Sequence, residues 1–465
     1  MKLKKAALSL AVAGVIGLSS VGFVACNSGS SNPDAFELQI YAGGYGTEPW
    51  EYVLNLFQED HPEVEIITYM DANANTQMAD RWRNGDPPDF VFLDGSGLDR
   101  DGWVNNRLLY DCTEWLETAT VNGSDERIID VVGSQFFNRN TYSDGTTITY
   151  GMPILKNSYG VWYDQAWCTE NKLNVPTNID ELKTFASEVK GVMADDGVTA
   201  SSAMCYPGSN APGYLVQGLI LPAIGAYDDD EYFQKIITAS DPDAFVDDRT
   251  VDVMQRFMDF VAAGGIMDGT ISLDHTTSQF RWLRHDAALI PNGLWLRNEL
   301  ETDIQNGKGS TDEGTTDTGD QNAFNTSDMR YGASPLVLST QKQTIVTTTV
   351  DCGVAAQGDQ VELALEFLTY LYRPDVAKVF ALAAETPSVV PITYTEEDNV
   401  SDSFAYAQAV LNSDEYLQVY KTGSWGAVDA EFSEIVNSIV AAGANQTTTA
   451  LEYCQRLQTV AREQL

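Results

Sequence analysis

Short apolar runs alternate with amphipathic stretches over the first hundred residues, and this alternation constrains the fold more than any other feature. Apolar runs occupy residues 36–41, 64–67 and 90–94. Between them, residues 48–61 and 76–84 carry apolar side chains at helical spacing. Strand–helix–strand–helix–strand at this spacing predicts a parallel sheet with helices on both faces, which is an α/β fold.

The two loops that follow the first and third predicted strands are candidates for a binding site. They comprise residues 43–47, which are rich in glycine, and residues 94–99, which begin and end with aspartate. Ligands of open α/β sheets bind beyond the carboxyl ends of the strands. We therefore expect side chains of these two loops to contact a ligand.

Length and charge set further limits. A chain of 465 residues exceeds one typical hydrophobic core, so at least two lobes are expected. The formal net charge of −40 argues against nucleic acid as a partner, because nucleic acid selects basic surfaces. Five cysteines follow Cys26 without a C-x-x-C pair, and we interpret them as mostly buried apolar side chains.

The N-terminus has the pattern of an export signal. Three lysines in the first five residues precede an uncharged, largely apolar stretch that ends at Ala25. This pattern predicts a signal peptide over residues 1–25. Cys26 is then the expected lipidated first residue of the mature chain, and residues 26–35 a flexible tether. We expect the protein at the cell membrane, lipid-anchored and facing outside the cytoplasm. The alternative is an ordinary secretory signal followed by an incidental cysteine, since Phe23 stands where a lipobox usually has leucine.

Four motifs follow one another along the rest of the chain. They are Tyr150-Gly151-Met152-Pro153 with Tyr163-Asp164 behind it, Asp286-Ala287-Ala288 with Gly293-Leu294-Trp295, Ala333-Ser334-Pro335-Leu336, and Ala364-Leu365-Glu366-Phe367 with Thr386-Pro387-Ser388. Their order and spacing resemble those of the family 1 extracellular solute-binding proteins, the maltose-binding-protein-like carbohydrate importers. Residues 173–182 are similar to a further segment of this family, in which Asn178 stands where tryptophan is usual.

The resemblance implies a two-lobed periplasmic-binding-protein-like fold of type II, with a hinge of crossing segments and a ligand cleft between the lobes. The expected N-terminal lobe comprises residues 36–154 plus 331–393, and the expected C-terminal lobe comprises residues 155–330 plus 394–465. The crossings are expected near residues 153–156, 329–331 and 391–395.

The resemblance also implies which residues contact the ligand. Sugars present C–H faces and hydroxyl edges, so a binder needs flat aromatic rings together with carboxylate and amide groups. The candidate ligand-binding residues are Tyr45, Thr47, Glu48, Asp94, Asp99, Asn157, Tyr159, Asn210, Trp295 and Trp425. Trp295 and Trp425 each lie beside glycine in a predicted turn, which favours a stacking role over packing in a core.

Capture of a sugar or oligosaccharide, and its delivery to the permease of an ABC importer, is the function that the resemblance implies. It implies a monomer without cofactor, bound metal or catalytic residue, and therefore not an enzyme. Two alternatives stay open: a secreted glycan-active enzyme that uses two carboxylates, and a sensor or adhesin ectodomain of the same fold. The chain has no G-x-S-x-G, H-E-x-x-H or phosphate-loop motif, and its acidic clusters lack the spacing of an EF-hand.

Overall fold

The computed structural model describes residues 33–95, 97–305, 325–421 and 425–465. The predicted signal peptide, Cys26 and most of the predicted tether lie outside the described residues. Among the residues that are described, every helix is too short or too polar to cross a bilayer.

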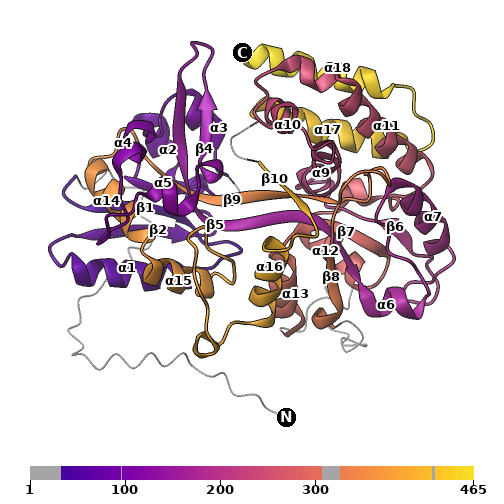
Figure 1. Ribbon diagram of the computed structural model, residues 1–465, viewed down its shortest axis with the longest axis horizontal. Helices are drawn as coiled ribbons and strands as arrows, with labels where there is room; N and C mark the ends of the chain where they lie inside the picture. Colours follow the sequence, from indigo (N-terminus) through magenta and orange to yellow (C-terminus); the bar gives the residue numbers. More distant parts are fainter. Residues whose placement is uncertain (1–32, 96, 306–324, 422–424) are drawn as a thin grey trace.

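The first lobe is built on the predicted parallel strands. Its strands β1 (Phe36–Tyr41), β2 (Ile66–Asp71) and β3 (Phe90–Phe92) lie in the order β2-β1-β3. The helices between them are α1 (Glu48–Asp60) and α2 (Ala74–Asn84), and they lie on opposite faces of the sheet in Figure 1. Further helices of this lobe are α3 (Arg100–Asn105), α4 (Thr113–Thr118), α5 (Ile128–Val132), α14 (Val361–Leu371) and α15 (Pro374–Ala383). The predicted α/β pattern is confirmed.

The second lobe surrounds β7 (Ala287–Gly293), which pairs in parallel with β6 (Ser202–Met204). Both β8 (Met329–Gly332) and β4 (Asn138–Thr141) pair with the long strand β5 (Thr147–Asp164). Strand β4 pairs with its first-lobe part. The helices of the second lobe and its edges are α6 (Gln165–Glu170), α7 (Ile179–Val189), α8 (Gly213–Leu215), α9 (Leu221–Gly225), α10 (Asp230–Ile237), α11 (Asp248–Ala262), α12 (His275–Leu283), α13 (Leu296–Gln305), α16 (Asp402–Leu411), α17 (Ala427–Ala442) and α18 (Ala450–Gln464).

Two long strands join the lobes. Strand β5 (Thr147–Asp164) and strand β9 (Thr344–Val354) pair antiparallel from Met152–Cys352 to Tyr159–Val346. In the first lobe β9 pairs with β3, and in the second β5 pairs with β7, so one sheet runs through both lobes in the order β2-β1-β3-β9-β5-β7-β6. Figure 1 shows β5 and β9 crossing the middle of the molecule, with β10 (Leu417–Tyr420) beside β9.

The crossings differ in part from the prediction. The crossing at residues 153–156 lies within β5, as expected. The return crossing lies in β9 and not at residues 329–331, because β8 pairs with the second-lobe end of β5. Accordingly Leu336 and Val346 pack in the second-lobe core, whereas Phe404 packs in the first. The predicted lobe boundary at residue 331 is therefore too early, because the loop between β8 and β9 still belongs to the second lobe. After the predicted boundary at residue 393, the segment that contains Phe404 still packs on the first lobe.

The five described cysteines are buried and unpaired, which confirms their interpretation as apolar side chains.

Candidate ligand-binding cleft

A cavity of about 640 Å³ lies between the two lobes, above the crossing strands. This volume is within the range of small-molecule sites. The first lobe contributes Tyr41, Tyr45, Asp94, Arg100 and Asn138, the second contributes Asn157, Tyr159, Asn210, Tyr214, Gln217, His275, Trp295 and Glu299, and β9 contributes Thr348 and Asp351. The cleft is thus shared between both lobes and the strands that join them.

The first-lobe wall follows from the strand ends. Tyr41 ends β1 and Asp94 lies two residues after β3, so the parallel sheet brings both to one edge. The ring of Tyr41 lies between Gly43 and Gly95, where an added Cβ would come within 1.9 Å of Cε1 and 2.2 Å of Cδ1, respectively. These two glycines therefore permit the close approach of the loops to the ring.

Charges on this wall are partly balanced. Burial raises the pKa of the Asp94 carboxyl, and the nearby Arg100 guanidinium opposes the rise. Arg100 also donates to the backbone carbonyl of Leu93, which fixes its position at the edge of β3. Burial raises the pKa of the Tyr45 hydroxyl well above its ordinary value, so this hydroxyl remains a hydrogen-bond donor.

Three aromatic rings form the second-lobe wall. Ring centroids are 5.2 Å apart between Tyr159 and Trp295, 5.6 Å between Tyr214 and Trp295, and 5.8 Å between Tyr159 and Tyr214. The Tyr159–Trp295 pair meets edge to face at 89°, a preferred arrangement for aromatic pairs. All three rings are half-buried, so part of each faces the cavity.

Local sequence explains how these rings meet. Tyr159 on β5 is in register with Gly293 at the end of β7. Trp295 follows two residues later and lies against that glycine, where an added Cβ would be 1.9 Å from its Cζ3 atom. Tyr214 comes from the first turn of α8. Burial raises the pKa of the Tyr159 and Tyr214 hydroxyls, so both remain protonated donors.

Polar groups beside the aromatic wall are held by one another. His275 Nε2 lies 3.4 Å from Glu299 Oε2, and the Gln279 amide donates to the same oxygen at 2.9 Å. The Asn210 side chain accepts from the backbone N–H of His275 at 2.9 Å. This network orients the Glu299 carboxylate at the cavity wall.

The floor of the cleft contains a buried carboxyl, that of Asp351 on β9. Its side chain is 1 % exposed, and its Oδ2 accepts from the Asn138 amide. Its Oδ1 has no hydrogen-bond partner among the residues that the structure describes. Burial raises the pKa of this carboxyl to about 6, although Arg100 opposes the rise.

A second cavity of about 420 Å³ extends the cleft outward. It shares Asp94, Gly95, Arg100 and Lys421 with the first and adds Asp99, Asp101 and Asp429. Burial raises the pKa of the Asp429 carboxyl, with Lys421 opposing the rise.

Most of the candidate residues lie at this cleft. Tyr45, Asp94, Asn157, Tyr159, Asn210 and Trp295 line the inner cavity, and Asp99 lines the outer one. Asn157 also has a structural task, because its Oδ1 accepts from the backbone N–H groups of Ser158 and Leu294. Contact of these seven candidate residues with a ligand remains a prediction.

Thr47 and Glu48 lie outside the described lining of either cavity. The chain enters α1 at this point, and Glu48 is exposed, with its carboxylate accepting from the Tyr52 hydroxyl at 3.1 Å.

The position of Trp425 differs from the prediction that its ring stacks on the ligand. Its side chain is fully buried, and its indole N–H donates to the Ile236 carbonyl at 2.8 Å. The ring stacks on Phe432, with centroids 5.5 Å apart and planes 21° apart. Trp425 is therefore a core residue of the second lobe, where it packs against Phe432 of α17.

Several lining residues were not predicted from the sequence, among them Tyr41, Arg100, Tyr214, His275, Glu299 and Asp351. Some carried a usable signal. Tyr41 is the last residue of a predicted strand, Glu299 is one helical turn after Trp295, and Asp351 is a lone acid in an apolar strand.

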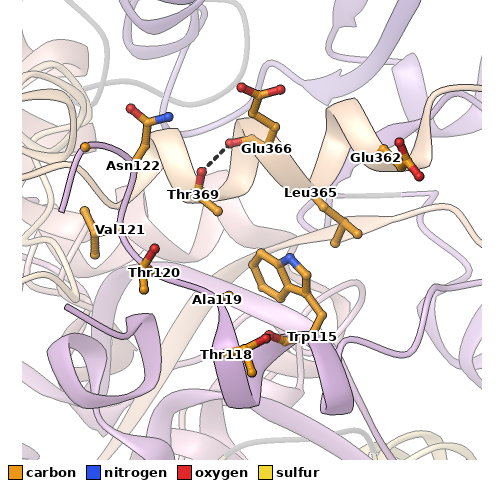
Figure 2. A pocket seen from close by; sticks show the side chains of 11 residues that line it. Trp115, Thr118, Ala119, Thr120, Val121, Asn122, Glu362, Leu365, Glu366 and Thr369 are labelled. Carbon is orange, nitrogen blue, oxygen red and sulfur yellow. Dashed lines mark hydrogen bonds between the residues drawn. The ribbon is translucent and has the colours of Figure 1, made fainter. Parts of the chain in front are cut away.

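A separate hollow lies on the outside of the first lobe, between α4 and α14. Figure 2 shows Trp115 directed toward Leu365, with Thr369 donating to the Glu366 carbonyl. Its described lining comes from the first lobe alone and contains one aromatic ring. It therefore lacks the facing walls of the cleft. Within the described ranges, no cluster of three or more histidine, cysteine or acidic side chains could hold a metal ion.

Comparisons with known proteins agree with this architecture. A family 1 extracellular solute-binding protein from Bifidobacterium longum subsp. infantis superposes with a TM-score of 0.63 and 17% identity, over 94% of this chain and 100% of that one. The chain has the fold of the family 1 extracellular solute-binding proteins. The two-lobed fold predicted from the sequence is confirmed.

Similarity in sequence is distributed over part of the chain. A diacetylchitobiose-binding protein of Streptomyces coelicolor is 25% identical over 281 residues, which are 59% of this chain and 55% of that protein. A multiple sugar-binding protein of Streptococcus mutans is 22% identical over 186 residues, 38% of this chain and 40% of that protein. The matches thus span about half the length of these relatives. No family model matches the chain.

Proposed function

We propose that this protein captures a sugar or oligosaccharide in the cleft between its lobes and delivers it to the permease of an ABC importer. The observation that carries the proposal is the aromatic wall of Tyr159, Tyr214 and Trp295, which faces carboxyl and guanidinium groups of the other lobe across one cavity. The sugar-binding names of the two sequence relatives support it.

Each wall suits one part of a sugar. The C–H face of a pyranose ring packs on the exposed part of an aromatic ring. Its hydroxyl edge then meets Asp94, Arg100 and Glu299, which form charge-assisted hydrogen bonds. The tyrosine hydroxyls add neutral donors.

Capture requires the lobes to close on the ligand. The walls belong to different lobes, and the strands β5 and β9 connect them. A ligand that contacts both walls favours the closed arrangement, because only that arrangement makes all the contacts. Closure about β5 and β9 is the step that presents a loaded protein to the permease.

Location and assembly complete the proposal. Lipid on Cys26 holds the protein at the outer side of the cell membrane, and the residues up to 35 form the tether. The protein acts as a monomer and not as an enzyme, with no catalytic group assigned in the cleft.

A thermal-shift screen of mono- and oligosaccharides against residues 27–465 tests the proposal. A ligand at 100 times its dissociation constant adds roughly 2.7 kcal/mol to the unfolding free energy, which is a readily measured shift in melting temperature. Trp115→Ala, in the outer hollow, is the matched control and retains the shift, whereas Tyr214→Ala loses most of it. Absence of a shift with every sugar, or loss of the shift in Trp115→Ala alone, contradicts the proposal.

A further inference from the structure

Two buried acceptor atoms in the cleft lack a donor among the described residues. Asp351 Oδ1, at the floor, has no partner among the described residues, although the side chain is 1 % exposed and lines the cavity. Gln217 Oε1, from the second lobe, is buried in the same cavity and likewise has no described partner. A buried acceptor without a donor costs free energy, so both positions call for a ligand that donates.

Charge in the cleft is unbalanced in the same direction. The described lining of the two cavities contains six carboxyl groups, Asp351 and Asp429 among them, but only three basic side chains, Arg100, Lys421 and His275, the last of which faces Glu299. Lys421 also lies over the ring of Trp425, with its Nζ 5.0 Å from the centroid. Closure of the lobes removes water from these carboxyl groups, which is costly for carboxyl charge in excess of the nearby basic groups.

Asp351 is placed to meet a cation directly. It lies on β9, between the two lobes, so a group bound there is enclosed from both sides when the lobes close. The Asn138 amide donates to Oδ2 and the Thr349 hydroxyl also favours the charged carboxyl, whereas Oδ1 has no hydrogen-bond partner among the described residues. Burial disfavours the charged form of this carboxyl, and a cation at Oδ1 restores it.

We propose that the cleft selects a basic amino sugar oligosaccharide, whose protonated amine binds Oδ1 of Asp351. This inference rests on the proposed sugar-capture function and adds the chemical class of the ligand. Neutral sugars fit the aromatic wall equally well but leave the Asp351 and Gln217 acceptors with weaker hydroxyl donors and the excess carboxyl charge without an offset.

Three disaccharides that share one backbone and differ at C2 provide the test. They are the β-1,4-linked dimer of glucosamine, its fully N-acetylated form, and cellobiose, with an ammonium, an acetamide and a hydroxyl group at that position. We expect calorimetry near neutral pH to give the glucosamine dimer an affinity about tenfold or more above that of the other two. Asp351→Asn, which keeps the shape and removes the charge, is expected to abolish the preference of the glucosamine dimer over the other two disaccharides.

Other outcomes overturn the inference. Equal affinities for the three dimers, or a preference for the acetylated or the neutral form, leave sugar capture intact but remove the basic ligand. A preference that persists in Asp351→Asn removes the assigned residue. Saturable binding of calcium chloride alone, in the absence of sugar, means that a metal ion supplies the missing charge. If no sugar of any kind binds, the proposed function itself fails. The wild-type comparison decides the ligand class even where Asp351→Asn fails to fold.

Discussion

Two tryptophans beside glycines give opposite predictions from this structure. Trp295 is half-buried and lines the cleft, whereas Trp425 is fully buried in the second-lobe core. We expect Trp295→Ala to lower the affinity for sugar and to leave the fold largely intact. We expect Trp425→Ala to lower the stability of the unliganded protein.

The cost at Trp425 follows from its contacts. Truncation removes a stacked pair with Phe432 and leaves the Ile236 carbonyl without its donor. Replacing a buried tryptophan by alanine costs roughly 3–5 kcal/mol of unfolding free energy. In a folding unit the size of the second lobe, each kcal/mol of lost unfolding free energy lowers the melting temperature by roughly 2–4 °C. A fall of about 6–20 °C is therefore expected for Trp425→Ala.

The cost at Trp295 falls on binding. An aromatic contact contributes roughly 0.5–1.5 kcal/mol beyond the area it buries, and the area adds about 25 cal/mol per Å². Loss of the ring is therefore expected to weaken binding about tenfold or more, since ~1.4 kcal/mol is one decade. The unliganded protein is expected to lose only about 1 kcal/mol of stability, because the ring is only partly buried and lines the cavity.

Calorimetric affinity and unliganded melting temperature, measured on both variants, separate the two roles. Trp425→Ala that still folds is expected to bind with nearly the wild-type affinity. Unchanged affinity in Trp295→Ala together with a large fall in its melting temperature would refute the assignment of the aromatic wall. Tenfold weaker binding by a stable Trp425→Ala would refute the assignment of Trp425 to the core.

Three further predictions concern the floor, the aromatic wall and the anchor. The pKa of Asp351 is raised from 3.8 to about 6 in the folded protein, so its charge lowers stability as the pH rises through this window. Asp351→Asn is therefore expected to stabilise the unliganded protein above pH ~6 by at most about 3 kcal/mol, in urea unfolding, and the gain is expected to vanish toward pH ~4; a gain independent of pH contradicts this. Gly293→Ala is expected to displace the Trp295 ring and to weaken sugar binding about as much as Trp295→Ala, whereas unchanged calorimetric affinity would mean that the ring position is unimportant. Cys26→Ala is expected to move the protein from the membrane fraction to the medium, and mass spectrometry of the wild type is expected to find lipid on Cys26; an unmodified wild-type N-terminus at another residue contradicts the anchor.

The helices and strands of the first lobe were predicted well, because their bounds follow from apolar spacing and breaker residues within short segments. Helix α1 was expected over residues 48–61 and spans Glu48–Asp60, with Pro62 behind it. Strand β9 spans Thr344–Val354, as its run of β-branched residues indicates. Once the parallel order was known, strand ends alone placed Tyr45 and Asp94 at one edge of the sheet.

Long-range features were not predictable from such patterns. The role of β9 as the return crossing depends on pairing with β5, which lies nearly two hundred residues earlier. Trp295 and Trp425 have similar local sequences, and only the packing of Phe432 and Ile236 separates them. Asp351 is recognisable as the lone acid of its strand, but its position on the cleft floor depends on the lobes on both sides of β9.

The radius of gyration, measured by small-angle X-ray scattering with and without a sugar that raises the melting temperature, tests the central claim most directly. We expect a smaller radius of gyration at saturating sugar, because a ligand between the aromatic wall and the first lobe draws the lobes together about β5 and β9. In Trp295→Ala the same radius is expected only at a correspondingly higher sugar concentration. A saturated wild-type protein whose scattering is identical to that of the unliganded protein would contradict capture by closure of this cleft.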